Sequence, residues 1–368
     1  MGKKMHSIFI KKADVRIWRA KLSTPFRTAK GQHDFLANVL FRVELTNGTQ
    51  GFGEAAVATH ITGETIEVTL KHLKEAAWEV QDHSIAAFPS LTEKFKERFA
   101  GNKCALAALE MALLDAMTRV KKMPLWRAFG NRVRKIRTDM TVILGDVNDA
   151  ENAAREILKR GICSLKVKVG GNFDMDLRRV AAVSKLAKRC PIYLDANQGF
   201  TAVQTLKFLK ELDKLKITPA LIEQPVPKED WEGLKNVTRN TKILVCADES
   251  VSSFEEAKRL IKEKAAGAIN IKYMKTGILE AYEIARMAQQ HHIQLMIGGM
   301  METPLATTAS AHLAAGLGGF DFIDLDAPFF MAQTITRGSY VNKAGVYDLC
   351  GVKAGIGVTP QNPVNLRG

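Results

Sequence analysis

The sequence predicts an α/β fold in which a parallel barrel follows a smaller α+β region. From residue 138 onward, short β-rich runs alternate with amphipathic segments of helical length that open with Asp or Ser caps. Charged residues stand late in these runs and recur at steps of 24 to 29 residues, which accommodates one strand, one helix and two short loops. Eight such runs favour a closed barrel over a doubly wound sheet. The runs lie at 140–144, 165–169, 192–197, 221–225, 244–249, 269–273, 295–300 and 322–327.

The first 130 residues follow a different pattern. Alternating apolar and polar residues at 13–22 and 38–55, the second stretch interrupted by an Asn-Gly turn, predict an antiparallel meander. A helical stretch at 104–122 follows. We therefore expect an α+β domain over residues 1–130 and a barrel over residues 131–340. The tail, about 341–368, has no place in a completed barrel and is expected to pack back on the first domain.

The charge balance raises nucleic-acid binding as a rival function. The chain has 53 basic and 39 acidic residues, which gives a net charge of +14. The densest basic run, at 131–137, has no interleaved aromatic residues, and no helix-turn-helix, zinc-finger or RNP motif accompanies it. We expect no nucleic-acid partner, and a non-catalytic nucleic-acid-binding protein is a distant alternative, because a basic surface also attracts anionic metabolites. The sequence does not indicate an oligomeric state, and a homo-oligomer stays open.

The cellular location is predicted from the apolar runs and the cysteines. No apolar run approaches the roughly 18 residues of a membrane-spanning helix, and the first residues do not resemble a secretory signal. The five cysteines are odd in number, and none has a close partner in the sequence. We therefore expect reduced thiols in a cytoplasmic protein that does not bind a membrane, with Cys163 and Cys246 in the core.

Lysines at two of the predicted strands indicate an active site. Lys166 and Lys168 share one face of the second run, because side chains two positions apart in a strand point the same way. Lysine is among the residue types least often buried without a partner. Lys168 ends the second run and Lys272 ends the sixth, so a ring of eight strands places these two amines on opposite sides of the barrel mouth.

Carboxylates occupy the positions between the lysines. Asp195, Glu223 and Asp248 end the third, fourth and fifth runs, and three carboxylates at one mouth repel one another unless a cation lies among them. Oxygen ligands of this kind suit Mg²⁺. Asp324 and Asp326 end the eighth run, opposite Glu223, and their spacing points both side chains inward.

This arrangement predicts proton transfer at a carbon beside a carboxylate. A metal-bound substrate carboxylate near Lys166 would extend across the mouth, and a cationic group at its far end would meet Asp324 and Asp326. The α-carbon would then lie between Lys168 and Lys272, one of which removes its proton while the other returns one from the opposite face. For this role we expect the lysine pKa to fall from about 10.4, because the cation and the second ammonium group disfavour the charged form.

Each feature also has a structural interpretation when it stands alone. The two lysines of the second run could lie on a solvated edge strand, Asp248 could cap a helix, and Lys272 could be a surface residue. The occurrence of all these features in step with the barrel repeat favours the active site.

Five short motifs resemble the muconate-lactonizing-enzyme subgroup of the enolase superfamily. They are KVK at 166–168, DAN at 195–197, EQP at 223–225, ADES at 247–250 and INIK at 269–272. The resemblance runs nearly end to end, since GFGEA at 51–55, ALLDA at 112–116 and PLWRAFG at 124–130 are similar to the subgroup's capping domain and its junction. It implies a modified TIM barrel, (β/α)7β, with an N-terminal α+β capping domain completed by the C-terminal tail. It also implies one Mg²⁺ per subunit, held by Asp195, Glu223 and Asp248.

The subgroup hosts several reactions on one pair of lysines, and the eighth run distinguishes among them. Its members include muconate cycloisomerases, o-succinylbenzoate synthases, N-succinylamino acid racemases and dipeptide epimerases. Asp324-Leu325-Asp326 resembles the carboxylate pair that binds the substrate's α-ammonium group in dipeptide epimerases, and two carboxylates would repel a succinyl or muconate carboxylate. We therefore expect a Mg²⁺-dependent dipeptide epimerase that acts through an enediolate, with the other three activities as alternatives.

The resemblance also indicates how a dipeptide is bound. Five residues match substrate-binding positions: Thr141, Asn197, Gly299, Met300 and Met301. Members that act on Ala-Glu carry an arginine in the first loop of the capping domain, where this chain has Gly31. Four basic residues could replace that arginine: Arg27, Lys30, His33 and His60. The identity of the dipeptide therefore stays open.

Overall fold

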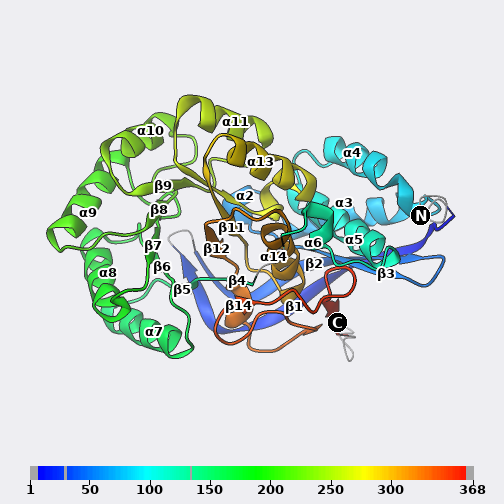
Figure 1. Cartoon of the computed structure of the whole chain (residues 1–368), viewed down its shortest axis with the longest axis horizontal. Helices are drawn as coiled ribbons and strands as arrows, with labels where there is room; N and C mark the ends of the chain where they lie inside the picture. Colours follow the sequence, from blue (N-terminus) through cyan, green and yellow to red (C-terminus); the bar gives the residue numbers. More distant parts are fainter. Residues whose placement is uncertain (1–6, 29–30, 133–134, 362–368) are drawn as a thin grey trace.

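The structure is a computed structural model, and it describes residues 7–28, 31–132 and 135–361. Eight parallel strands form one sheet whose order follows the chain from β5 to β12 (Figure 1). Their bounds are β5 (Met140–Val142), β6 (Leu165–Lys168), β7 (Ile192–Asp195), β8 (Leu221–Glu223), β9 (Leu244–Ala247), β10 (Ala268–Ile271), β11 (Gln294–Gly298) and β12 (Phe322–Asp324). Each of the eight predicted runs overlaps one of these strands, and β10 and β11 each begin one residue before their runs, which confirms the predicted barrel.

The two edges of this sheet meet beside β12. Asp139 N donates to Ile323 O over 2.9 Å, and Leu325 N donates to Thr138 Oγ1 over 2.8 Å. A short 3-10 helix, Ala327–Phe330, follows β12 where an eighth α-helix would stand in a complete β/α repeat. The fold is therefore a nearly closed barrel of the (β/α)7β kind.

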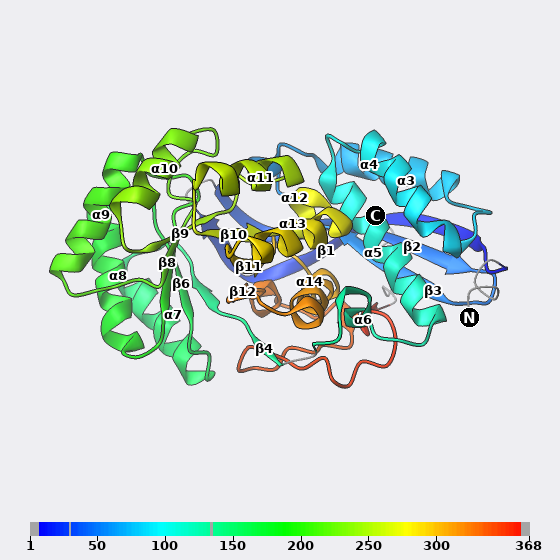
Figure 2. The ribbon, with the colours of Figure 1, turned by 45° about the horizontal axis from the view of Figure 1, so that its top comes forward.

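Seven long helices connect the strands and cover the outside of the barrel (Figures 1 and 2). Their bounds are α7 (Val147–Lys159), α8 (Phe173–Ala187), α9 (Ala202–Lys214), α10 (Trp231–Asn240), α11 (Phe254–Glu263), α13 (Ile278–Gln290) and α14 (Pro304–Leu317). Capping boxes built on Asp146 and Thr201 define the first residues of α7 and α9. In the described part of the chain, every helix is too short or too polar to span a bilayer.

The N-terminal region is a three-stranded antiparallel sheet covered by helices, as the alternating pattern predicts. Its strands are β1 (Ile10–Thr28), β2 (Gly31–Leu45) and β3 (Gln50–Ala55), and its main helices are α3 (Ile66–Glu79), α4 (Phe88–Arg98) and α5 (Lys103–Val120). Gly53 allows α5 to pack directly on β3, because a Cβ at this position would lie 1.9 Å from the carbonyl oxygen of Ala108. This close contact fixes β3, whose end leads to the cavity described below.

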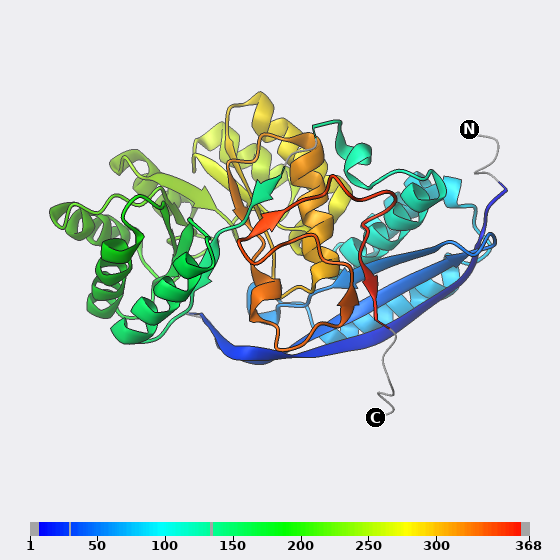
Figure 3. The same cartoon turned by 60° about the horizontal axis from the view of Figure 1, so that its bottom comes forward.

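The C-terminal tail returns to the N-terminal region (Figure 3). Gly355 N donates to Met123 O over 3.0 Å, and Ile356 N donates to the buried Asp115 Oδ1 of α5 over 2.7 Å. From the other side, Ala332 N donates to Lys21 O of β1 over 2.9 Å, which connects the segment after β12 to the N-terminal sheet. The domain limits of 1–130 and 131–340 stay a prediction.

The expectation of five reduced cysteines is wrong for two of them. Cys163 and Cys190 form a disulfide with a Cα–Cα distance of 5.0 Å, and Cys163 is exposed instead of lying in the core. The cause is strand register: Leu165 pairs with Ile192, so the residues two positions before these strands lie side by side although 27 positions separate them in the sequence. Cys246 is buried and free, as predicted.

Candidate active site

The carboxyl ends of the barrel strands open into a cavity of about 580 Å³. Ten of the predicted site residues line it: Thr141, Lys166, Lys168, Asn197, Lys272, Gly299, Met300, Met301, Asp324 and Asp326. The three predicted metal ligands, Asp195, Glu223 and Asp248, are fully buried and contact the lysines of this group. The structure therefore brings all thirteen predicted residues together at one end of the barrel.

Strand register explains why residues distant in sequence meet at the same level. Lys168 pairs with Asp195 across β6 and β7, and Asp195 pairs with Glu223 across β7 and β8. Lys166 precedes Lys168 by two residues on β6 and therefore lies deeper in the barrel. Its Nζ contacts three carboxylates: it is 2.9 Å from Asp195 Oδ2, 2.7 Å from Glu223 Oε2 and 2.6 Å from Asp324 Oδ2. Lys166 thus connects the acidic group on β7 and β8 with the acidic pair that ends β12.

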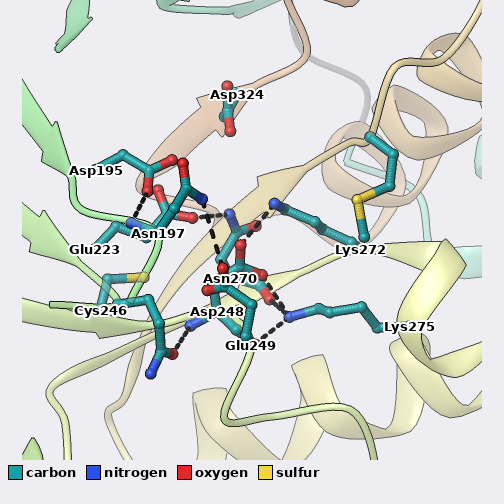
Figure 4. A network of polar contacts seen from close by, with 12 residues as sticks. Asp195, Asn197, Glu223, Cys246, Asp248, Glu249, Asn270, Lys272, Lys275 and Asp324 are labelled. Carbon is teal, nitrogen blue, oxygen red and sulfur yellow. Dashed lines mark hydrogen bonds and ion pairs between the residues drawn. The ribbon is translucent and has the colours of Figure 1, made fainter. Parts of the chain in front are cut away.

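The two predicted bases enter the cavity from strands four positions apart in the barrel. Lys168 Nζ contacts Asp195 Oδ2 over 2.7 Å and donates to Asn197 Oδ1 over 2.8 Å. Lys272 directly follows β10, and its Nζ is 2.7 Å from Asp248 Oδ2 (Figure 4). Each amine is therefore held in place by a different carboxylate.

Two side chains that the sequence analysis missed complete this network. Lys275 lies on the short helix α12 (Tyr273–Thr276), and its Nζ contacts Asp248 Oδ1 over 2.7 Å (Figure 4). Asn270 of β10 donates through Nδ2 to Glu223 Oε1 over 2.7 Å. Asn270 could have been found, because it lies two positions before Lys272 on the same face of the strand. Lys275 has no such signal, since no periodic pattern marks a four-residue helix.

Burial and neighbouring charges shift the pKa values of the three carboxyl groups in different directions. Burial alone would raise the pKa of Asp195 and that of Asp248, but the charges of adjacent lysines outweigh burial and lower both. The pKa of Glu223 is raised to about 8, first by burial and then by the charge of Asp195. Negative charge is therefore concentrated on Asp195 and Asp248.

The expected fall in lysine pKa is not found at Lys272. Burial lowers the pKa of this amine, but the charges of Asp248 and Glu223 outweigh burial and raise the pKa above its usual value. Lys166 follows the same rule, since Asp195, Asp324 and Glu223 surround it. The prediction considered the effect of cations on the lysines and left out the carboxylates that pair with them.

A divalent cation fits the first acidic group by its chemistry. Asp195, Glu223 and Asp248 are fully buried carboxylates at the ends of three adjacent strands, and hard oxygen donors of this kind suit Mg²⁺. Ammonium groups of lysines balance their charge in the structure. Among the described residues, a different set, Asp139, Asp324 and Asp326, has carboxylate oxygens within 4.8 Å of one another.

Asp324, the last residue of β12, and Asp326, two positions after it, line the cavity, and a backbone contact from β5 fixes Asp326. Asp326 Oδ2 accepts from Thr141 N over 2.7 Å, while Asp324 Oδ2 contacts Lys166. Burial, and then the charge of Asp324, raises the pKa of Asp326 to about 6. The pair therefore presents carboxylate oxygens to any cationic group that enters the cavity.

Glu54 of β3 holds the loop that carries Gly299, Met300 and Met301. This fully buried carboxylate accepts from Thr303 Oγ1 over 2.5 Å and from Thr303 N over 3.0 Å. Asn38 of β2 donates both to Glu54 Oε1 and to Met301 O, at 2.5 and 2.9 Å. The sequence motif GFGEA contains Glu54, but its function as a clamp between the N-terminal sheet and the barrel was not predicted.

The N-terminal region supplies a mostly apolar wall to the cavity. Its lining side chains include Phe35, Leu36, Val57, Ile61 and Ile66. Of the four basic candidates, His60 lines the cavity, Lys30 lies outside the described residues, and nothing is described of the side chains of Arg27 and His33. Among the described residues that line the cavity, none is an arginine.

Comparisons with known proteins agree with this geometry. The model of the mandelate racemase / muconate lactonizing enzyme N-terminal domain matches residues 12–130, and the enolase C-terminal domain-like model matches residues 149–364. A hydrophobic dipeptide epimerase from Citrifermentans bemidjiense is 45% identical over 363 residues, which are 96% of this chain and 99% of that protein. An aromatic dipeptide epimerase from Herpetosiphon aurantiacus is 40% identical, over 92% of this chain and 95% of that protein. The crystal structure of a dipeptide epimerase from Enterococcus faecalis, complexed with Mg and L-Leu-L-Tyr, is similar with a TM-score of 0.91 at 32% identity, over 95% of this chain and 99% of that one.

Proposed function

The chain belongs to the dipeptide epimerase family of the enolase superfamily, and we propose that it inverts the α-carbon of the C-terminal residue of a dipeptide. One observation carries the mechanism: Lys168 and Lys272 reach one cavity from β6 and β10, which lie four strands apart in the barrel. A carbon held between them has one amine on each face. One lysine, as the neutral amine, takes the α-proton, and the ammonium group of the other returns a proton to the opposite face.

The substrate carboxylate binds at the side of the cavity next to Asp195, Glu223 and Asp248. These residues would hold one Mg²⁺ per subunit, and the ion when bound would neutralise and polarise the substrate carboxylate. Lys166, which contacts Asp195 and Glu223, supports the negative charge that develops on that carboxylate as the α-proton leaves. Lys272 pairs with Asp248, so a cation shared with this carboxylate would weaken the pairing and lower the pKa of the lysine.

The substrate's α-ammonium group belongs at Asp324 and Asp326. Two buried carboxylates attract a cationic end group and repel a succinyl carboxylate, which favours a dipeptide over an N-succinylamino acid. The apolar wall built from Phe35, Val57 and Ile61 favours a hydrophobic side chain on the dipeptide, in keeping with the name of the 45% identical relative.

Isotope exchange tests this function directly. The enzyme, supplied with Mg²⁺, is incubated in D₂O with a library of L,L-dipeptides, and mass spectrometry identifies those that gain one deuteron. We expect exchange on dipeptides with a hydrophobic C-terminal residue, together with formation of the L,D-isomer. Exchange confined to N-succinylamino acids would assign the chain to the racemases instead. No exchange at all, combined with salt-sensitive DNA binding, would favour the nucleic-acid alternative.

A further inference from the structure

Asp139 is a buried acidic residue, just before β5, that the mechanism above does not use. The residue is 1% exposed, and neither of its carboxylate oxygens has a hydrogen-bond partner in the described part of the chain. Its backbone is held in place, because Asp139 N donates to Ile323 O over 2.9 Å. Buried carboxylates are normally paired, since an isolated charge in a protein interior is strongly destabilising. Asp139 therefore requires an explanation.

Two other carboxylates lie close to Asp139. One oxygen of each of Asp139, Asp324 and Asp326 lies within 4.8 Å of the others. The ammonium group in contact with this set is that of Lys166, 2.6 Å from Asp324 Oδ2, and Lys166 also contacts Asp195 and Glu223. When all three are ionised, these aspartates carry more negative charge than the ammonium group of Lys166 neutralises.

The cavity meets this set from one side. Asp324 and Asp326 line the cavity, whereas Asp139 is not part of the lining. A cation that enters the cavity can therefore contact Asp324 and Asp326, and it favours the ionised form of Asp139, whose charge then attracts the cation from behind this pair. Charges a few ångströms apart interact strongly at the buried end of a cavity, because little water screens them.

The geometry points to Asp139 as a residue that selects for the free α-ammonium group of the substrate. It strengthens the negative potential at Asp324 and Asp326 without contacting the substrate, so it is a positioning residue and not a catalytic one. The inference rests on the proposed dipeptide epimerase activity. Burial raises the pKa of Asp139 well above its usual value, and the charges of Asp324 and Asp326 raise it further. An arriving ammonium group opposes these effects and favours the ionised carboxylate.

The test compares one ligand with and without its ammonium group. Dissociation constants of L-Leu-L-Leu and N-acetyl-L-Leu-L-Leu are measured by calorimetry with Mg²⁺ present, for the wild-type enzyme and for Asp139→Asn. We expect the variant to bind the free dipeptide roughly tenfold more weakly and to bind the acetylated ligand with less than about a twofold change. Asp213→Asn, which removes the same charge from an exposed position on α9, is the matched control and should change neither constant.

Three results would contradict this inference or the function on which it rests. An equal loss of affinity for both ligands would mean that Asp139 only supports the fold, and it would overturn the inference. The inference would also be overturned if Asp139→Asn distinguished the two ligands as wild type does but held one fewer metal ion per chain by elemental analysis. That result would make the three aspartates a metal site. Wild-type enzyme that binds neither ligand would contradict the proposed function itself.

A second variant keeps the test decisive if Asp139→Asn folds poorly. Asp139→Ser leaves room for water in place of the carboxylate and removes the same charge. Because both ligands are measured on one preparation, a fraction of unfolded protein does not change the ratio of the two constants. The dissociation constant of the acetylated ligand divided by that of the free dipeptide is expected to fall roughly tenfold in either variant. If this ratio is unchanged in both variants, the inference is overturned.

Discussion

The two ends of the barrel differ in the interactions that hold them together. At the carboxyl ends of the strands, buried lysines and carboxylates from β6 to β12 surround a cavity. At the amino ends, the Cys163–Cys190 disulfide joins the segments that enter β6 and β7. Burying charge is costly, and in the barrel buried lysines and carboxylates gather around the cavity, while a covalent bond stabilises the opposite end. Substitutions at the two ends should therefore separate turnover from stability.

Removing either lysine that we propose as a base should cause the largest loss of activity. Lys168→Ala and Lys272→Ala are each expected to lower kcat for epimerisation by about 10⁴-fold, because one of the two proton transfers loses its acid or base. The remaining lysine should still exchange the α-proton of one stereoisomer in D₂O. Comparing L,L- and L,D-dipeptides by mass spectrometry checks this, and the two variants should prefer opposite isomers.

A matched lysine at the outer surface of the barrel serves as the control. Lys235 of α10 pairs with Glu263 over 3.1 Å and lies outside the cavity, so Lys235→Ala should keep wild-type turnover. Wild-type epimerisation in Lys168→Ala or in Lys272→Ala would rule out the two-base scheme.

Removal of divalent cations should have the next largest effect. Treatment with EDTA is expected to lower kcat by about 10³-fold, because the substrate carboxylate loses the charge that stabilises proton removal. Mg²⁺ should restore activity, and Asp195→Asn should weaken Mg²⁺ binding in calorimetry. Full activity after EDTA treatment, with no metal detected by elemental analysis, would contradict the assignment of Asp195, Glu223 and Asp248.

Neutralising the acidic pair at β12 should give a smaller and more selective loss. Asp324→Asn is expected to lower kcat/KM for free dipeptides by roughly 10- to 100-fold, since the substrate ammonium group loses a charged partner. Steady-state kinetics with a dipeptide that the exchange screen identifies provide the measurement. Unchanged constants would mean that the ammonium group binds elsewhere.

The sequence predicts the carboxyl end of the barrel far better than the amino end. Strand ends with charged residues follow a repeat that can be counted along the chain, and for this reason Lys168, Asp195 and Glu223 were found together. The disulfide depends on the register between β6 and β7, which places Cys163 beside Cys190 and which no local pattern reveals. Asp139 lies close to Asp324 only when the barrel closes. The position of Asp139 in the sequence, just before β5, therefore does not predict that it belongs to the site.

Breaking the disulfide should lower stability and leave turnover intact. The bond closes a loop between residues 163 and 190, and Cys163→Ser is expected to lower the free energy of unfolding by about 3 to 4 kcal/mol. Urea unfolding, with and without reductant, measures the change, while kcat/KM should stay within about twofold because the bond lies at the end of the barrel away from the cavity. Cys350→Ser, which removes an exposed free thiol, is the control. An unfolding midpoint that reductant does not move would contradict the bond.

The smaller of the two effects on stability depends on pH and involves His312 of α14. The ring is fully buried, accepts from Trp126 N at Nδ1 over 3.0 Å, and contacts Ile356 O through Nε2 over 3.0 Å. This pattern requires the neutral ring with its proton on Nε2, and burial lowers its pKa from 6.5 to about 4.

The direction of the pH effect follows from this shift. Between pH 6.5 and 4 the unfolded chain binds a proton at His312 that the folded chain excludes, so stability from this group falls as the pH falls, by up to about 3 kcal/mol. Glu110, whose pKa burial raises to about 7, acts in the opposite direction, because its contribution is present at low pH and lost as the pH rises. The difference between wild type and His312→Gln therefore isolates the histidine. Urea unfolding at several pH values should show that the substitution costs less stability at pH 4 than at pH 7, and a constant cost would assign the acid sensitivity to other groups.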